Sequence, residues 1–285
     1  MNIKNEIISY WNEQFILSNQ EQINFIHRKS QLAKAHQKRI EHVQGWVKLL
    51  SENNDNDQVN YDLHFRWLVK DKDYFYHEEE YIPFMANIEN DKVMAHRIRE
   101  PLPYSIIKFD GPKSDETSSF PRYSYNRREA VRYAESWWDS YNPAFKYFSD
   151  NDCTNYISQC LFAGGVPMNG APNRNKGWWY NANSWSFSWS VAHAFRWHLS
   201  GSNAGLQGSE VDDAKELMLG DVICYDFEGD GKWDHTTIVT AKDSQGMPLV
   251  NAHTNNSRHR YWNYKDSYAW TPNCAYRFFR IGEKN

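Results

Sequence analysis

The sequence has few cysteines, no long apolar run and no excess of positive charge. Four cysteines in 285 residues are too few for a disulfide-stabilised scaffold, and the lack of a Cys-x-x-Cys pair argues against a thiolate zinc site. No run of about 18 apolar residues predicts a transmembrane helix. The net charge of −4 gives no basic footprint for nucleic acid. We therefore expect free thiols, no nucleic-acid partner and no cofactor.

The N-terminal sequence MNIKNEIISYWNEQF is interrupted by charged residues where a secretory signal has a continuous apolar segment. We expect a soluble chain that is either cytoplasmic or an already processed secreted or envelope protein, and the sequence leaves the compartment open. A chain of 285 residues has room for two domains. Aromatic residues make up 16% of the chain, a surplus that suggests a binding groove as well as a core.

The N-terminal part of the sequence predicts helices followed by long strands. Apolar residues recur at helical spacing up to about residue 50, and an amphipathic helical segment is expected over 27–50. From Val59 to Val69 the apolar residues alternate, as in a strand with one buried face, and further strands are expected over 74–86 and 92–99. We predict an α+β accessory domain over residues 1–115, with a pattern like that of cone-shaped modules.

Residues 100–122 have the composition of a linker, with four prolines and a Ser/Asp/Thr cluster, so we place the domain boundary near residue 115. The second domain, 116–285, opens with a helix whose start is indicated by Asn126 and Glu129, three residues apart. Further helices follow, and short strands separated by turns begin at Asp221. Both domains are therefore predicted to be α+β.

The stretch DCTNYISQCL, residues 152–161, predicts a helix with a cysteine at its N-terminus. Asn151 or Asp152 can cap this helix, which would place Cys153 in its first turn with the inward face formed by Tyr156, Ile157 and Cys160. At that position the helix dipole favours a thiolate, and the free N–H groups can hold an oxyanion. A cysteine hydrolase keeps its nucleophile in such a place, whereas the alternative is a buried structural cysteine.

A thiolate hydrolase needs a base near neutral pKa and a group that orients it. His235 follows a polar loop and begins the strand HTTIVTA, where substrate could reach its ring at a sheet edge. In the next strand, Asn251 and His253 share one face. If the two strands pair, either residue can reach the far nitrogen of His235 and fix its tautomer.

These motifs resemble the putative amidase domain family of the NlpC-type papain-like cysteine hydrolases. The similarity runs from about residue 123 to 281 and rests on four blocks in the family's order, which are NRREAVRYAESWW, DCTNYISQCL, DHTTIVT and NAHTNN, together with the SWS-rich segment. The resemblance implies a papain-like domain in which the cysteine helix packs on an antiparallel sheet. It also implies Cys153 as nucleophile, His235 as base and His253 as the third residue, for which Asn251 and Asn255 remain alternatives.

Four tryptophans between Gly177 and Ser190 are candidates for a substrate groove, because flat rings stack on sugar and peptide faces. They are Trp178, Trp179, Trp185 and Trp189. Part of this cluster is expected to serve packing.

The loop YDFEGDGKWD approaches a calcium-loop pattern. The candidate ligands are Asp226, Glu228, Asp230 and Asp234. The twelfth position, however, is Thr237 in place of the bidentate glutamate. An acidic turn that presents His235 is the alternative, and we predict no metal as part of the chemistry.

The sequence thus predicts a cysteine amidase or peptidase, a thiol protease in the broad sense, that cleaves a peptide-type amide through a thioester. The family suggests bacterial cell-wall or envelope peptides of the peptidoglycan type as substrates. An acyltransferase on the same fold and a non-catalytic binding module remain alternatives. A third is an interaction protein, because the alternating strands of the N-terminal domain could provide a face for self-association.

Overall fold

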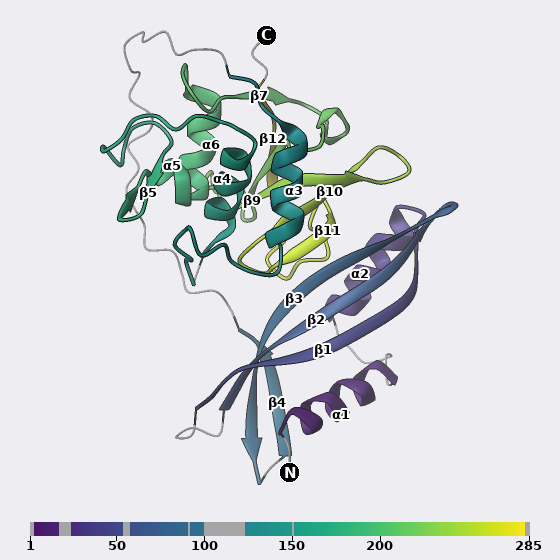
Figure 1. Ribbon diagram of the computed structural model, residues 1–285. Helices are drawn as coiled ribbons and strands as arrows, with labels where there is room; N and C mark the ends of the chain where they lie inside the picture. The colour runs from purple at the N-terminus through teal and green to yellow at the C-terminus, as the bar shows by residue number, and fades with distance from the viewer. Residues whose placement is uncertain are drawn as a thin grey trace. The chain divides into compact units, whose positions relative to one another are not determined.

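The computed structural model describes residues 3–16, 24–53, 58–90, 92–99, 123–149 and 151–282, and the chain is an α+β protein (Figure 1). It divides into two compact units. The first consists of Met1–Leu102 with Tyr264–Tyr268, and the second of Pro103–Asn263 with Ala269–Asn285. The predicted linker and the boundary near residue 115 lie outside the described residues.

The first unit contains two helices and four antiparallel strands in the order β1-β2-β3-β4. Its elements are α1 (Ile3–Ile16), α2 (Asn24–Ala35), β1 (Arg39–Asn53), β2 (Gln58–Asp71), β3 (Tyr74–Glu89) and β4 (Lys92–Ile98). Alternate residues of β2 are buried, and Trp11 of α1 donates a hydrogen bond from Nε1 to Tyr61 Oη at 2.9 Å. The helices therefore cover the apolar face of the sheet, as the alternation predicts.

The prediction of helix up to residue 50 was wrong beyond Ala35, because residues 39–53 form strand β1. This strand pairs with β2 along its whole length, with Val43 opposite Trp67 and Val47 opposite Leu63. Pairing with a long neighbouring strand overrides the local helical spacing, which is a weak determinant of structure.

The second unit combines helices with a six-stranded antiparallel sheet in the order β11-β10-β9-β8-β12-β7. Its helices are α3 (Arg127–Trp137), α4 (Cys153–Ala163), α5 (Phe187–Ser190), α6 (Ala192–Gly201) and the 3₁₀ turn η1 (Ala214–Glu216). Its strands are β5 (Tyr180–Asn181), β6 (Ser184–Trp185), β7 (Gly208–Val211), β8 (Val222–Asp226), β9 (His235–Lys242), β10 (Pro248–Ala252), β11 (Ser257–Tyr261) and β12 (Ala275–Ile281). As predicted, Asn126 caps α3 by accepting the Glu129 N–H at 3.3 Å.

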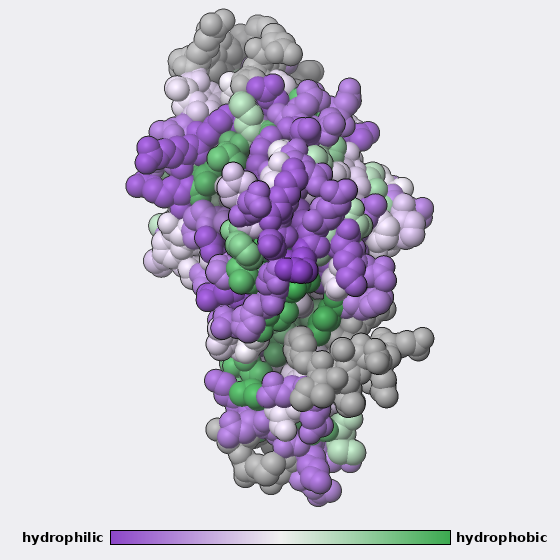
Figure 2. Space-filling view, turned by 90° about the vertical axis from the view of Figure 1, so that its right-hand side faces the viewer, coloured by the Kyte–Doolittle hydropathy of each residue, from purple (hydrophilic) through white to green (hydrophobic). Residues whose placement is uncertain are grey.

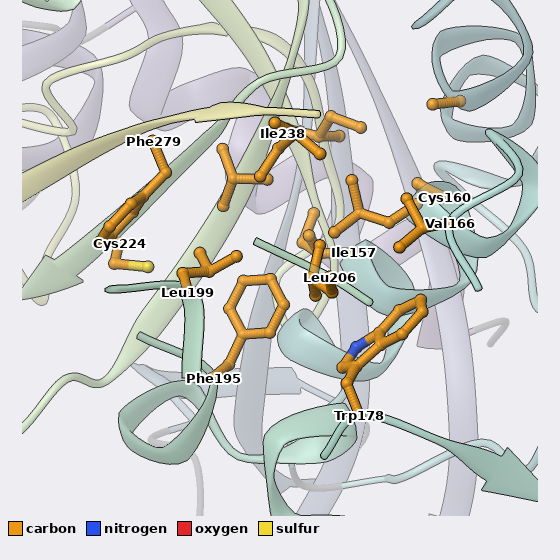
Figure 3. Close-up of a cluster of buried hydrophobic side chains, with 14 of the residues drawn as sticks. Ile157, Cys160, Val166, Trp178, Phe195, Leu199, Leu206, Cys224, Ile238 and Phe279 are labelled. Atoms are coloured by element: carbon orange, nitrogen blue, oxygen red, sulfur yellow. The ribbon is translucent and has the colours of Figure 1, made fainter. Parts of the chain in front are cut away.

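The core of the second unit lies between the helices and one face of this sheet. Ile157 and Cys160 of α4 and Phe195 of α6 pack with Cys224 of β8 and Ile238 of β9 in a buried cluster (Figure 3). Cys160 and Cys224 are therefore core residues, and the four cysteines are free thiols. The packing fixes α4 on the sheet, with its N-terminal residue Cys153 completely buried.

The molecular face in Figure 2 is mostly hydrophilic, with hydrophobic residues in separate areas. None of the helices within the described part of the chain has the length and apolar character needed to cross a membrane.

Candidate active site

Cys153 is the first residue of α4, and its thiol is completely buried. The Sγ–H group donates a hydrogen bond to Asn151 Oδ1 at 3.1 Å, and Thr154 Oγ1 lies 3.7 Å from Sγ. Burial raises the pKa of the thiol above its ordinary value, although nearby hydroxyl groups of threonines oppose this effect. The helix N-terminus predicts a stabilised thiolate, but in this closed arrangement desolvation dominates and the thiol keeps its proton.

The N-terminus of α4 is closed by Thr254, which follows β10. The backbone N–H groups of Asp152 and Cys153 both donate to Thr254 Oγ1, each at 3.2 Å. Thr254 has φ of +83°, an unfavourable value for a β-branched residue. The expected cap by the Asp152 side chain is absent, because that carboxylate is engaged by the Phe148 N–H, by Asn155 Nδ2 and by His253.

The Asp152 carboxylate pairs with His253. Its Oδ2 lies 2.7 Å from Nδ1 of the ring, while Nε2 lies 2.7 Å from the carbonyl oxygen of Trp137, and both side chains are only 3% exposed. A neutral imidazole donates from only one nitrogen, and both partners of this ring are acceptors. Asp152 and the Trp137 carbonyl therefore engage both ring nitrogens of His253 in a buried arrangement, and the two paired residues are the sequence neighbours of Cys153 and Thr254.

His235 lies on the other face of the sheet. In the β8–β9 ladder Thr236 is opposite Cys224, and Thr236 Oγ1 lies 3.1 Å from Thr154 Oγ1 of α4, so Thr236 faces the cysteine helix. Because side chains alternate along a strand, His235 points away from that helix. Its ring centroid lies 5.7 Å from that of Tyr225 and 6.0 Å from that of Phe227.

Burial, with a smaller contribution from Arg260, lowers the pKa of His235 to about 3. Within the residues that the structure describes, no hydrogen bond or ion pair joins His235 to Cys153. The structure thus pairs Asp152, the residue directly before Cys153, with His253, and it places His235 on the opposite face of the sheet.

The predicted pairing of β9 with β10 is present, but Asn251 is directed toward α3 and not toward His235. Its Oδ1 accepts hydrogen bonds from Thr240 Oγ1 at 2.8 Å and from the His259 N–H at 2.9 Å, and its Nδ2 donates to Glu135 Oε1 at 2.8 Å. Asn255 lies in the turn between β10 and β11, half-buried. Asn251 therefore braces the strand that leads to His253.

The residue that sequence reasoning assigned to capping alone is Asp152. The alternation of Leu249, Asn251 and His253 places His253 on the helix side of the sheet, and the acidic residue directly before Cys153 is its buried partner. Reading the strand face of His253 together with the cysteine motif could have identified this pair.

Of the four predicted groove tryptophans, three are buried in the core. Trp178 and Trp189 are fully buried and donate from Nε1 to Ser158 Oγ at 2.9 Å and to Asn155 Oδ1 at 2.8 Å. Trp179 is 2% exposed and donates to backbone carbonyl groups. Among the four, only Trp185 is partly exposed to solvent. It is therefore the one predicted groove tryptophan that a substrate could contact in this structure.

The acidic loop after β8 gathers only part of the predicted calcium ligands. Oxygens of Asp226, Glu228 and Asp234 lie within 4.8 Å of one another, but the Asp230 carboxylate pairs with Lys232 on the surface. The Asp226 carboxylate accepts backbone N–H groups of residues 229, 230 and 231, which hold the turn together. Burial raises the pKa of Asp234 to about 7, and the neighbouring Glu228 adds to this effect. Three of the four predicted ligands therefore lie together in a turn that backbone hydrogen bonds to Asp226 hold in place.

A small pocket opens beside the Asp152–His253 pair. Exposed Tyr141 and Tyr147 lie at its mouth with their hydroxyl oxygens 3.1 Å apart. The ten lining residues are Trp137, Tyr141, Asn142, Phe145, Lys146, Tyr147, Asp152, Asn155, Gln159 and His253. Asp152 and His253 thus border a small hollow at the surface of the second unit.

The second unit is thus an α+β domain with a thiol at a helix N-terminus and, at the residue before it, a buried Asp–His pair. Residues 124–279 match the model of the family described as "Putative amidase domain", and the chain belongs to this family. No solved structure matches the chain.

Two proteins of Bacillus subtilis (strain 168) are similar to it. "Uncharacterized protein YhbB" is 46% identical over 237 residues, which cover 81% of this chain and 76% of that protein. "Uncharacterized protein YjcM" is 32% identical over 139 residues, which cover 46% of this chain and 31% of that protein.

Proposed function

We propose that the second unit is a cysteine-dependent amidase of the papain-like, NlpC-type kind, with Cys153 as nucleophile. The observation that carries this proposal is the position of the thiol at the N-terminus of α4, beside the buried Asp152–His253 pair. The match to the putative amidase family over residues 124–279, a range that contains these residues, supports amide chemistry. The domain division predicted from the sequence, 1–115 and 116–285, is part of the proposal.

In the proposed reaction, substrate binding displaces Thr254 from the α4 N-terminus and frees the Cys153 N–H to hold the oxyanion. The Cys153 thiol transfers its proton to the base, attacks the amide carbonyl and forms a tetrahedral intermediate. The base then gives the proton to the leaving amine, a thioester remains on Cys153, and water hydrolyses it with the base accepting a proton from that water.

Two histidines compete for the role of base. His253 is favoured by the geometry, because it lies on the helix side of the sheet and has a carboxylate that orients its ring. In the closed form its two nitrogens are engaged by Asp152 and the Trp137 carbonyl, so the same opening that frees Cys153 must release one of them. His235, favoured by the motif, would need β9 to present its other face. We therefore propose His253 as the base and Asp152 as the residue that orients it.

The test is capture of the acyl-enzyme. The full chain is incubated with a panel of peptide amides and peptidoglycan-type peptides, quenched in acid, and analysed by mass spectrometry for an acyl adduct on Cys153. We expect the adduct in the wild type and its loss in Cys153→Ala, while Cys160→Ala serves as the matched control. An adduct on another residue, or product formation by Cys153→Ala, would refute the assignment.

The same experiment separates the rival functions. An added amine such as hydroxylamine competes with water for the thioester, so a product distribution that favours the amine at low concentration indicates an acyltransferase. Tight binding of a peptide without any adduct indicates a binding module.

Light scattering of the full chain tests the proposed self-association through the first unit. Bacterial cell-wall peptides are the first substrates to examine, because both similar proteins come from Bacillus subtilis.

A further inference from the structure

Trp185, the accessible member of the predicted groove, is flanked by two cations. The Lys146 ammonium lies 5.0 Å from the centroid of its ring, and the Arg174 guanidinium carbon lies 5.5 Å from it. Phe148 packs edge-on against the same indole, with a centroid separation of 5.0 Å. Cation–π contacts of this kind hold both charges in place beside the aromatic ring.

Both cations keep most of their hydrogen-bonding capacity. Arg174 uses Nε to donate to the Trp185 carbonyl oxygen at 3.0 Å, which leaves its two terminal amino groups available. Across the described ranges, neither Arg174 nor Lys146 forms an ion pair with a carboxylate, and the Lys146 ammonium donates no hydrogen bond. Both side chains are exposed. Two uncompensated positive charges with free donors, fixed around one ring, match an anionic group on a ligand.

This cluster is connected to the candidate active site. The carbonyl oxygen of Lys146 accepts Asn155 Nδ2 at 2.9 Å, and Asn155 also donates to Asp152 Oδ1 at 2.8 Å. The Phe148 N–H donates to the same carboxylate oxygen at 3.1 Å. Lys146 also lines the pocket that reaches Asp152 and His253. Lys146 is therefore shared by the pocket beside Asp152 and His253 and by the cluster around Trp185.

We propose that Lys146, Arg174 and Trp185 form a subsite for an anionic group of the substrate, and that this group is the carboxylate of an acidic residue in a peptide. The proposal rests on the proposed function, since it names the substrate class of that site. The indole packs against the aliphatic part of the acidic side chain, and the two cations bind its carboxylate.

Binding is measured with Cys153→Ser protein, so that the result does not depend on turnover. The probes are a glutamate-containing peptide, the same peptide with glutamine in place of glutamate, and inorganic phosphate, each titrated by calorimetry in low salt. We expect the glutamate peptide to bind about tenfold more tightly than the glutamine peptide, a preference that weakens as salt screens the charges. Adding Lys146→Gln or Arg174→Gln should remove most of this preference without weakening the glutamine peptide.

The matched control is Arg128→Gln, an exposed arginine on α3 outside the cluster. It should leave the preference for glutamate unchanged. Equal affinity for the two peptides, or a preference that Arg128→Gln reduces as much as Arg174→Gln does, overturns the proposal. If phosphate binds as tightly as the glutamate peptide, the recognised group is a phosphate and not a peptide carboxylate. That result would overturn the peptide assignment.

Failure of the subsite is distinguishable from failure of the proposed function. If the peptides bind with the expected preference but the wild type forms no acyl adduct, the subsite stands and the amidase is refuted. If an adduct forms equally with the glutamate and the glutamine peptides, the amidase stands and the subsite is refuted.

Discussion

The two faces of the sheet in the second unit differ in the chemistry that they present. On the helix side, polar groups pair across elements, with Asp152 against His253 and Thr154 against Thr236. On the opposite face, His235 lies among aromatic rings, and burial keeps it neutral. Both histidines belong to motifs of the same family resemblance, yet only His253 shares a face with the cysteine. Position in a motif therefore does not decide chemical role until the face of the strand is known.

The largest expected effect is on kcat/KM, which should fall much further when His253 is replaced than when His235 is replaced. His253→Gln should lower kcat/KM for any peptide amide that the protein cleaves by about 10²–10⁴-fold, the usual contribution of a general base. His235→Gln should change it less than about fivefold, because its ring is on the other face. Steady-state kinetics on both variants, with circular dichroism to verify folding, make the comparison. The opposite ranking would restore His235 as the base.

A somewhat smaller effect is expected on stability. Asp152→Ala leaves His253 buried without its carboxylate partner, and removal of one member of a buried ion pair costs about 3–5 kcal/mol. Urea unfolding measures the loss. Asp230→Ala removes a surface carboxylate that pairs with Lys232 and should leave the unfolding midpoint unchanged. Similar midpoints for the two variants would mean that the Asp152–His253 pair is not held as described.

Thr254 offers a third comparison on the helix side. Thr254→Val keeps the shape but removes the hydroxyl that accepts the N–H groups of Asp152 and Cys153, so we expect a loss of about 1–3 kcal/mol in the free energy of unfolding. Thr254→Ser retains the acceptor and is the control. Equal losses in the two variants would show that the methyl group, not the hydroxyl, matters at this position.

The smallest effect concerns pH and the opposite face. The folded-state pKa of His235 is about 3, below the ordinary value of about 6.5, so its contribution to stability is complete above pH 6.5 and decreases as the pH falls toward 3. Between pH 6 and 4 the wild type should lose about 1 kcal/mol per pH unit more than His235→Gln does. Chemical denaturation at several pH values measures the two slopes. Parallel slopes would mean that His235 is hydrated and titrates normally.

Local signals in the sequence predict the elements that depend on local contacts. The helix at Cys153, the cap at Asn126 and the alternating strand at Val59–Val69 all follow from neighbours within a few residues. Strand β1 depends on pairing with β2, and the burial of Trp178 and Trp189 depends on their contacts with α4. The spacing of apolar residues along the sequence does not predict such tertiary contacts.

The candidate site shows the same limit. The helix that begins at Cys153 could be predicted from the sequence, because a polar turn followed by an apolar stripe marks its N-terminus. The Asp152–His253 pair is harder to predict, because the two residues are 101 positions apart in sequence and meet through packing of α4 against β10 and its following turn. Only the strand face of His253, read together with the cysteine motif, points to it. The face of His235 likewise depends on the register of β8 and β9, which no local pattern specifies.

The buried thiol of Cys153 has a consequence for the lifetime of the protein. Oxidation by peroxide and exchange with other disulfides both require an accessible thiolate, whereas this sulfur is fully covered and keeps its proton. We therefore expect the Cys153 thiol to resist oxidation in the folded protein. Exposure of the folded protein to peroxide should accordingly leave Cys153 reduced, and unfolding should make it reactive.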